Sequence, residues 1–170
     1  MKVSVNPPRP LAETDDRTTF DCGRESLNAW FRRHGWANQI NNVSRITVLT
    51  DATNGCLVGY FTLSAGQIER AFLPKPQQRN RPDPLPTLLL GQLAIDKAYQ
   101  GQGHAVDLLL EAYRRTLAAS QNIGCTGLFT HTADDAVRHF YARWGFCDLP
   151  FDPRRAMIVR IEDLARYLMK

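Results

Sequence analysis

A short apolar run followed by a glycine-containing turn and a helical pattern is the feature that most restricts the fold of this sequence. The run spans residues 87–96 (TLLLGQLAID), and its continuous apolar character is typical of a central strand buried on both faces. After the turn 100–105 (QGQGHA), one helical stripe carries Val106, Leu109, Leu110, Tyr113 and Leu117. This order predicts an α/β or α+β sheet domain with helices on its faces.

The segment before this run predicts a helix and a β-hairpin. Leu27, Trp30, Phe31 and His34 recur at helical spacing, with Asp21 as the N-cap and the stop at 41–42 (NN). At that spacing Trp30 and Phe31 are interpreted as core residues. Segments 45–50 and 57–63 are rich in β-branched residues, and Asn54-Gly55 between them favours a hairpin turn.

The segments after this hairpin predict a loop, two strands and two helices. Residues 75–86 hold four prolines and predict a functional loop. A strand is expected over 125–131, and a helix from about Ala133, with Gly145 at its C-terminal cap. A closing strand over 156–161 and a terminal helix over 162–169 complete the order. At 170 residues, the chain is expected to form a single domain over 1–170.

Composition narrows the functional classes. No apolar stretch is long enough for a membrane helix and the N-terminus does not resemble a signal peptide, so a cytoplasmic protein without membrane contact is expected. The four cysteines form no C-x-x-C pair, so no metal site is expected. The net charge of +4 is compatible with a nucleic-acid partner and does not establish one.

The turn 100–105 is the motif that carries chemistry. A helix that starts after a buried strand presents free N–H groups and the positive end of its dipole, which suits phosphate binding. Gly101 and Gly103 remove side chains that would keep a pyrophosphate from the backbone. By spacing alone, an ordinary strand-to-helix turn remains the more common interpretation of two such glycines.

Two motifs resemble those of the GNAT acetyltransferases. The turn is similar to the Q/R-x-x-G-x-G/A pyrophosphate loop of that family, and 140–146 (FYARWGF) is similar to its F-Y-x-x-x-G-F segment. The resemblance implies the GNAT fold, a central mixed twisted sheet flanked by helices. It also implies acetyl-CoA as cosubstrate, without a metal.

The likeness narrows to the GNAT toxins of bacterial toxin–antitoxin pairs. It is carried by 20–23 (FDCG), 44–45 (SR), 58–63 (VGYFTL), 79–86 (RNRPDPLP) and 90–96 (LGQLAID). Such toxins acetylate the α-amine of the amino acid on charged tRNA and stop translation. The resemblance therefore implies aminoacyl-tRNA as substrate, a ribbon-helix-helix antitoxin and a homodimer.

Site residues follow from the same resemblance. The pantetheine and thioester would lie along Leu93, Ala94 and Ile95, where a backbone N–H from Leu93 or Ala94 would stabilise the oxyanion. Tyr141 matches the family tyrosine that acts as general acid, although its spacing alone suits a core residue. The cofactor phosphates would contact Gln100, Gly101, Gln102, Gly103, His104 and Ala105.

Residues for the acceptor substrate are less specific. The basic side chains expected to hold tRNA are Arg45, Arg79 and Arg81, with Lys75 and Lys97 as weaker choices. Each can equally be a solvated surface charge. No general base is evident; His131 and His139 are the candidates. An α-amine is partly neutral near pH 8, so the reaction does not demand a base.

Three positions depart from the toxin pattern. Gln92 and Gln102 stand where the group carries arginine, and Ala105 stands where it carries glycine. Loss of the arginine at 102 is expected to weaken phosphate binding without abolishing it. These departures keep open the alternative of a catalytically weak protein that binds coenzyme A or an antitoxin. A second alternative, an acetyltransferase for a small amine or a protein N-terminus, also stays open.

Overall fold

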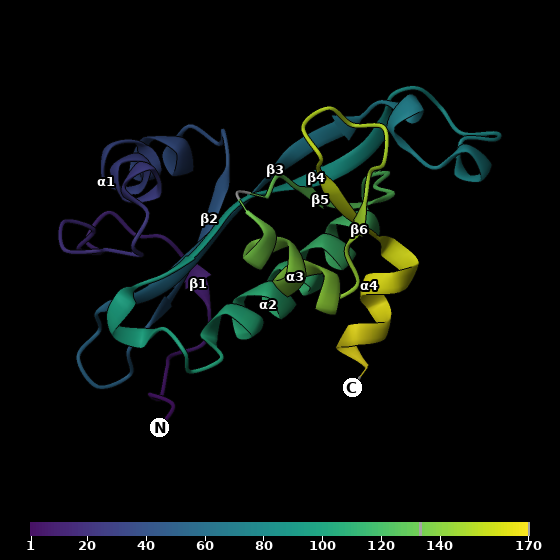
Figure 1. The fold of residues 1–170 in the computed structure, drawn as a ribbon. Coiled ribbons are helices and arrows are strands. Elements are labelled where there is room, and N and C mark those ends of the chain that lie inside the picture. Colours follow the sequence, from purple (N-terminus) through teal and green to yellow (C-terminus); the bar gives the residue numbers. More distant parts are fainter. Residues whose placement is uncertain (133, 170) are drawn as a thin grey trace. The chain divides into compact units, whose positions relative to one another are not determined.

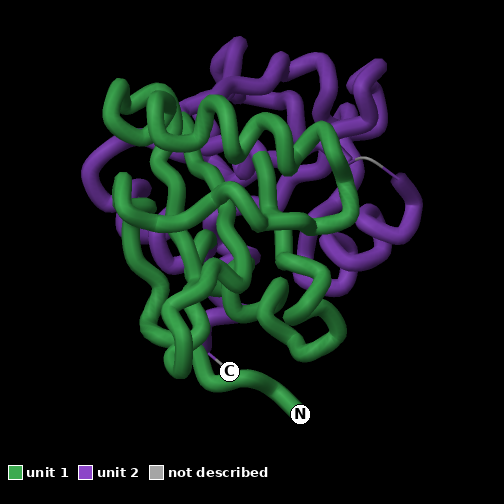
Figure 2. The backbone as a smooth tube through the Cα atoms, turned by 90° about the vertical axis from the view of Figure 1, so that its left-hand side faces the viewer, with its two compact units in different colours: residues 1–64, 92–112 green, residues 65–91, 113–170 purple. Residues whose placement is uncertain are grey.

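The computed structural model describes residues 1–132 and 134–169. The chain groups into two compact units, 1–64 with 92–112 and 65–91 with 113–170 (Figure 2). Strands β3 (Leu57–Ile68) and β4 (Leu85–Ile95) and helix α2 (His104–Ser120) each run from one unit into the other. The single-domain organisation stays a prediction.

The strands follow the hydrogen-bonding order β1-β2-β3-β4-β5-β7-β6, in which β1 is Arg9–Pro10 and β6 is Cys147–Asp148 (Figure 1). β4 pairs in parallel with β5 (Gly127–Thr130), whereas β2 (Arg45–Thr50) pairs antiparallel with β3, and β5 with β7 (Met157–Arg160). This mixed sheet with α-helices confirms the expected α/β class. Within the described residues, no helix combines the length and apolarity needed to cross a membrane.

The first unit is built on the expected hairpin and on helix α1 (Glu25–Ile40). Phe31 stacks on Tyr60 with ring centroids 3.9 Å apart, and Phe20 meets both rings edge-on. These three residues are fully buried, so they form the centre of this core. Trp30 packs against it, as its helical spacing predicted.

Two expectations about α1 are wrong. The N-cap is Arg24, and the Asp21 carboxylate instead accepts hydrogen bonds from the Gly23 N–H and the Asn28 side chain. Asn28 also accepts from the Cys22 N–H, so its amide is buried with its polar groups satisfied. The buried face of the helix consequently runs through Asn28 and leaves His34 exposed.

The second unit contains helices α3 (Asp135–Arg143) and α4 (Ile161–Leu168) and two short 3₁₀ turns, Arg70–Phe72 and Lys75–Gln77. The expected helix start at Ala133 lies outside the described residues; Asp134 caps α3 by accepting from the Val137 N–H. Gly145 follows the C-cap with φ of 96°, as predicted.

Other element boundaries differ from the sequence-based prediction. β4 begins earlier than the apolar run, at the buried Leu85, so it takes up the end of the proline-rich loop. Two strands of two residues each were not predicted, β1 (Arg9–Pro10) and β6 (Cys147–Asp148). A segment of two residues is too short to show the alternation of apolar and polar side chains that marks a strand. Only pairing with neighbouring strands defines it.

Candidate functional site

The end of β4 lies tightly against β3 in the first unit. A Cβ atom at Gly59 would lie 2.7 Å from the Ala94 carbonyl oxygen and 2.6 Å from Ile95 Cδ1. Only glycine allows this approach, so the backbone of 93–95 is fixed by its neighbour strand. Leu93 is half-buried, and the Ala94 and Ile95 side chains are buried.

Gln100 anchors the start of the turn. Its side-chain amide donates to the Ile95 carbonyl at 2.9 Å and to the Cys22 carbonyl at 3.0 Å. The glutamine of the motif therefore ties the turn to the end of β4 and to the segment before α1. Its amide nitrogen is committed to these two backbone oxygens.

The next residues form a backbone cradle. Gly101 and Gly103 have φ of 79° and 89°, a region that L side chains rarely adopt. A Cβ at Gly101 would meet nothing within 4 Å, so its backbone is open to an incoming group. His104 begins α2, and the first N–H groups of a helix have no intrahelical acceptor. This arrangement fits a pyrophosphate.

The other side chains of the turn add no charge to this cradle. The Gln102 side-chain oxygen accepts from the Val3 N–H at 2.7 Å and lies 3.2 Å from His104 Nε2. The His104 side chain is fully buried, and burial lowers its pKa, with Lys2 acting in the same direction and Asp107 opposing them. His104 is therefore neutral at pH 7.

Gln92 makes its hydrogen bonds with residues of β3 and not with the turn 100–105. Its side-chain oxygen accepts a 2.6 Å hydrogen bond from the Tyr60 hydroxyl, and its N–H donates to the Thr62 hydroxyl. Burial raises the pKa of Tyr60, so this phenol stays protonated and keeps donating. The Gln92 side chain thus satisfies the hydroxyl of Tyr60, a residue of the aromatic core of the first unit.

Tyr141 is held in the second unit by α3. Its side chain is buried and packs against Phe140 and Phe146, with ring centroids 5.3 and 5.0 Å away. Burial raises the pKa of Tyr141 to about 12, and an interaction with the Thr130 hydroxyl opposes that rise. The phenol is consequently protonated throughout the neutral range and can donate a proton.

The expected tRNA-binding residues fall into two places. Lys75, Arg79 and Arg81 share one loop of the second unit, where Lys75 and Arg79 are exposed and Arg81 is half-buried. The Arg70 guanidinium donates to the Arg81 carbonyl at 2.8 Å and stabilises this loop. Arg45 is exposed at the start of β2, in the first unit.

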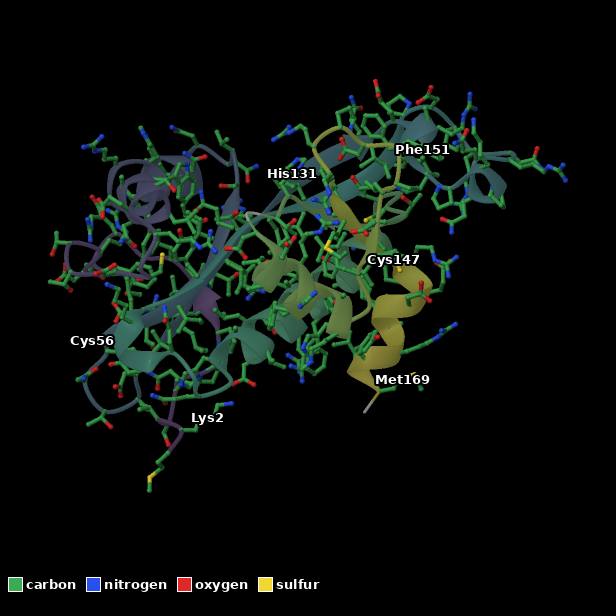
Figure 3. All side chains as sticks on the ribbon, in the orientation of Figure 1. Lys2, Cys56, His131, Cys147, Phe151 and Met169 are labelled. Atoms are coloured by element: carbon green, nitrogen blue, oxygen red, sulfur yellow. The ribbon has the colours of Figure 1, made fainter. Side chains whose placement is uncertain are left out.

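The two candidate bases are both exposed. His131 follows β5 (Figure 3). Partial burial together with Arg154 lowers its pKa. His139 lies on α3. Among the described residues, no group of three or more His, Cys, Asp or Glu side chains is arranged to hold a metal ion.

One residue at the turn was not found from the sequence. Lys2 contacts the Asp107 carboxylate at 2.5 Å, in the first turn of α2. Lys2 lies about a hundred positions from this helix and belongs to no motif. A structure was needed to place it there.

Comparison with known proteins gives the family. Residues 42–148 match the acetyltransferase (GNAT) domain. The "tRNA-acetylating toxin" of Mycobacterium tuberculosis (strain ATCC 25618 / H37Rv) is 35% identical over 152 residues, which are 89% of this chain and 90% of the relative.

Solved structures agree with this match. AtaT complexed with acetyl-methionyl-tRNAfMet is 29% identical, with a TM-score of 0.88 over 98% of this chain and 100% of that one. A mutant AtaT toxin bound to the C-terminus of the antitoxin AtaR and acetyl-CoA has 27% identity and a TM-score of 0.82, over 98% and 99% of the two chains. The chain therefore belongs to the GNAT acetyltransferase family, in the group of the tRNA-acetylating toxins.

Proposed function

We propose that this protein is a toxin that transfers the acetyl group of acetyl-CoA to the α-amine of the aminoacyl group on charged tRNA and so blocks translation. The observation that carries this proposal is the relative named a tRNA-acetylating toxin, whose match covers 89% of the chain. The AtaT complexes with acetylated aminoacyl-tRNA and with acetyl-CoA support the same substrates.

The structure of the turn supports the cosubstrate. The backbone of 101–104 and the start of α2 would bind the pyrophosphate, and Gln100 keeps the turn on the end of β4. The Leu93 or Ala94 N–H would donate to the carbonyl oxygen as negative charge develops there. Bound acetyl-CoA supplies an activated thioester. The fixed backbone of 93–95 suits this role, since a preorganised donor costs no rearrangement during the reaction.

The state of Tyr141 supports a general acid. A phenol with a pKa of about 12 carries its proton at neutral pH and can donate it to the departing thiolate. The attacking α-amine has an ordinary pKa near 8, lower still when its carboxyl is esterified, so much of it is neutral at physiological pH. The mechanism therefore needs no protein base, and His131 and His139 have no assigned role in it.

The partners follow from the toxin group. The relatives support binding to an antitoxin, because AtaT is solved with the C-terminus of AtaR. We further propose that this antitoxin is a ribbon-helix-helix protein and that the toxin is a homodimer in the cytoplasm, where charged tRNA occurs. Light scattering of the purified protein tests the dimer: a mass near 38 kDa, twice the 19.2 kDa chain, is expected, and a monomer mass would contradict it.

Acetyl transfer with labelled acetyl-CoA tests the function. Each of a panel of charged tRNAs is incubated with the protein, and the same tRNAs in deacylated form are the matched controls. Label is expected on one or more charged tRNAs and on none of the deacylated ones. Label on a polyamine or a peptide N-terminus together with inert charged tRNA would instead favour the small-amine alternative.

A further inference from the structure

The phosphate-binding turn brings no cation of its own to a strongly anionic cosubstrate. Residues 100–105 contain no Lys or Arg, and the histidine among them is buried and neutral. The pyrophosphate and the 3′-phosphate of coenzyme A carry several negative charges. Backbone N–H groups alone would have to balance them, and a backbone N–H, unlike a Lys or Arg side chain, brings no positive charge to a phosphate.

The N-terminal segment places a lysine against this turn. Lys2 Nζ lies 3.6 Å from the position that a Cβ of Gly103 would occupy, so the ammonium borders the space that this glycine leaves open. Figure 3 shows Lys2 near the N-terminal end of the chain. The adjacent residue is fixed to the same turn, because the Val3 N–H donates to the Gln102 side-chain oxygen.

Asp107 keeps the ammonium there. Its carboxylate contacts Lys2 Nζ at 2.5 Å, and both side chains are close to half exposed. An uncompensated carboxylate in the first turn of α2 would repel a bound phosphate; Lys2 neutralises it. An ammonium has three donors, so Lys2 can keep Asp107 and still donate to a phosphate oxygen.

A polar atom without a hydrogen-bond partner also lies at the start of α2, on the His104 side chain. Its side chain is fully buried, and its Nδ1 has no hydrogen-bond partner among the residues that the structure describes. The Asp107 carboxylate lies 3.9 Å from this nitrogen, beyond hydrogen-bond distance. The start of α2 thus brings together a buried imidazole nitrogen without a partner among the described residues, a half-exposed carboxylate and a lysine from about a hundred positions earlier.

From these contacts we infer that Lys2 is the cation of the acetyl-CoA site and donates to a phosphate group of the cosubstrate beside Gly103. This inference rests on the proposed function for the identity of the ligand. It explains how the turn can bind a phosphate with an uncharged residue at 102. The Gln102 side chain fixes the Val3 backbone and thereby positions Lys2. A distant residue supplies the charge that an arginine in the turn would supply.

Binding of acetyl-CoA to the full chain, measured by calorimetry, tests this role. Lys2→Met keeps the unbranched stem of the side chain and removes the charged ammonium at its end. We expect about tenfold weaker binding, in line with the loss of one charge-assisted contact. Lys2→Arg should bind as the wild type does, and Arg33→Met, which removes an exposed positive charge from α1, is the matched control and should be unchanged.

Shortened ligands identify the phosphate. If Lys2 holds the pyrophosphate, 3′-dephospho-CoA should show the same tenfold loss; if it holds the 3′-phosphate, that ligand should show no loss. Acetyl-pantetheine, which has neither group, should bind both proteins equally. Equal binding of acetyl-CoA to wild type and Lys2→Met would overturn the inference, and so would an equal loss for acetyl-pantetheine, which would indicate a purely structural effect.

A second variant separates a lost charge from a folding defect, because it adds a cation to the Lys2→Met protein. Gln102→Arg places a cation within the turn, so it should restore binding in the Lys2→Met background and add less in the wild type. Strict additivity of the two changes would contradict a shared role. The readout is binding of acetyl-CoA and not acetyl transfer. If Lys2→Met weakens this binding while the wild type acetylates no charged tRNA, the inference stands and the proposed function fails.

Discussion

At the scale of single residues, Tyr141 combines two properties that a general acid needs. Its hydroxyl belongs to a buried ring on α3, and burial keeps the phenol protonated, with a pKa of about 12. The flanking rings of Phe140 and Phe146 restrict its side chain. A fixed phenol that already carries its proton can donate it to a leaving group without first being protonated or reoriented.

Tyr141→Phe is expected to slow acetyl transfer by about 10²- to 10⁴-fold, the usual contribution of a general acid. Affinity for acetyl-CoA should change little, because the phenol acts on the leaving thiolate and not on the phosphates. Single-turnover rates and calorimetry separate the two effects.

Tyr113→Phe is the matched control for that substitution. It removes another buried phenol of the second unit, one that donates to the Trp144 carbonyl. It should lower the free energy of unfolding by about 1–3 kcal/mol, because the carbonyl of the half-buried Trp144 loses its donor, and leave the transfer rate unchanged. A transfer rate in Tyr141→Phe equal to that in Tyr113→Phe would exclude Tyr141 as the acid.

The raised pKa of Tyr141 also fixes the pH dependence. A general acid works in its protonated form, which persists below its pKa, so the tyrosine should cause no fall in rate between pH 7 and 10. On the acid side, the rate should fall as the substrate α-amine takes up a proton, below about pH 8. Single-turnover rates at short times, before the aminoacyl ester hydrolyses, measure this profile; a decline from pH 8 to 10 would contradict it.

Residue roles were predictable from the sequence only where a motif carries them. Tyr141 and the turn 100–105 were recognised by resemblance, and their local geometry supports that prediction. Lys2 could not be found, because its contact with Asp107 spans most of the first unit's sequence. Gln92 stands where the toxin group carries arginine, and only the structure shows that its side chain accepts a hydrogen bond from Tyr60.

At the scale of secondary structure, the site depends on the close approach of β3 to β4. Gly59→Ala would place a Cβ within 2.7 Å of the Ala94 carbonyl, so strand β4 must shift. We expect a loss of about 1–3 kcal/mol in the free energy of unfolding, which is typical of overpacking, together with weaker acetyl-CoA binding.

Chemical denaturation and calorimetry measure both effects of Gly59→Ala. Gly124→Ala is the control, because a Cβ there meets nothing within 4 Å and should change neither quantity appreciably. Normal acetyl-CoA affinity in a destabilised Gly59→Ala protein would show that the exact position of 93–95 is unimportant for the cosubstrate.

Elements defined by local patterns were predicted well. The hairpin and the helix after the turn follow from residue spacing, and the end of α3 follows from a glycine where the backbone needs a positive φ. The N-cap of α1 was wrong because Asp21 bonds to Asn28, a side-chain contact that competes with capping. Strands β1 and β6 exist through distant partners and leave no local pattern.

At the scale of the whole molecule, the basic loop of the second unit is the proposed contact with the tRNA backbone. Arg79→Ala should weaken binding to every tRNA to a similar degree and reduce the slope of log affinity against log salt by about one, as the loss of one phosphate contact does. Filter binding at several salt concentrations measures this. Arg33→Ala on α1 is the control, and loss of affinity for one tRNA alone would indicate base recognition instead.

The central claim is that the acetyl group goes to the α-amine of an aminoacyl-tRNA, and mass spectrometry of the reaction product tests it most directly. Charged tRNA is incubated with acetyl-CoA and the protein, then digested to aminoacyl-adenosine. The wild type should add about 42 mass units to the aminoacyl part, the net gain when an acetyl group replaces one amine hydrogen, and Tyr141→Phe should add almost none in the same time. Unmodified aminoacyl-adenosine from every charged tRNA, or an acetyl group on the nucleoside, would contradict the account.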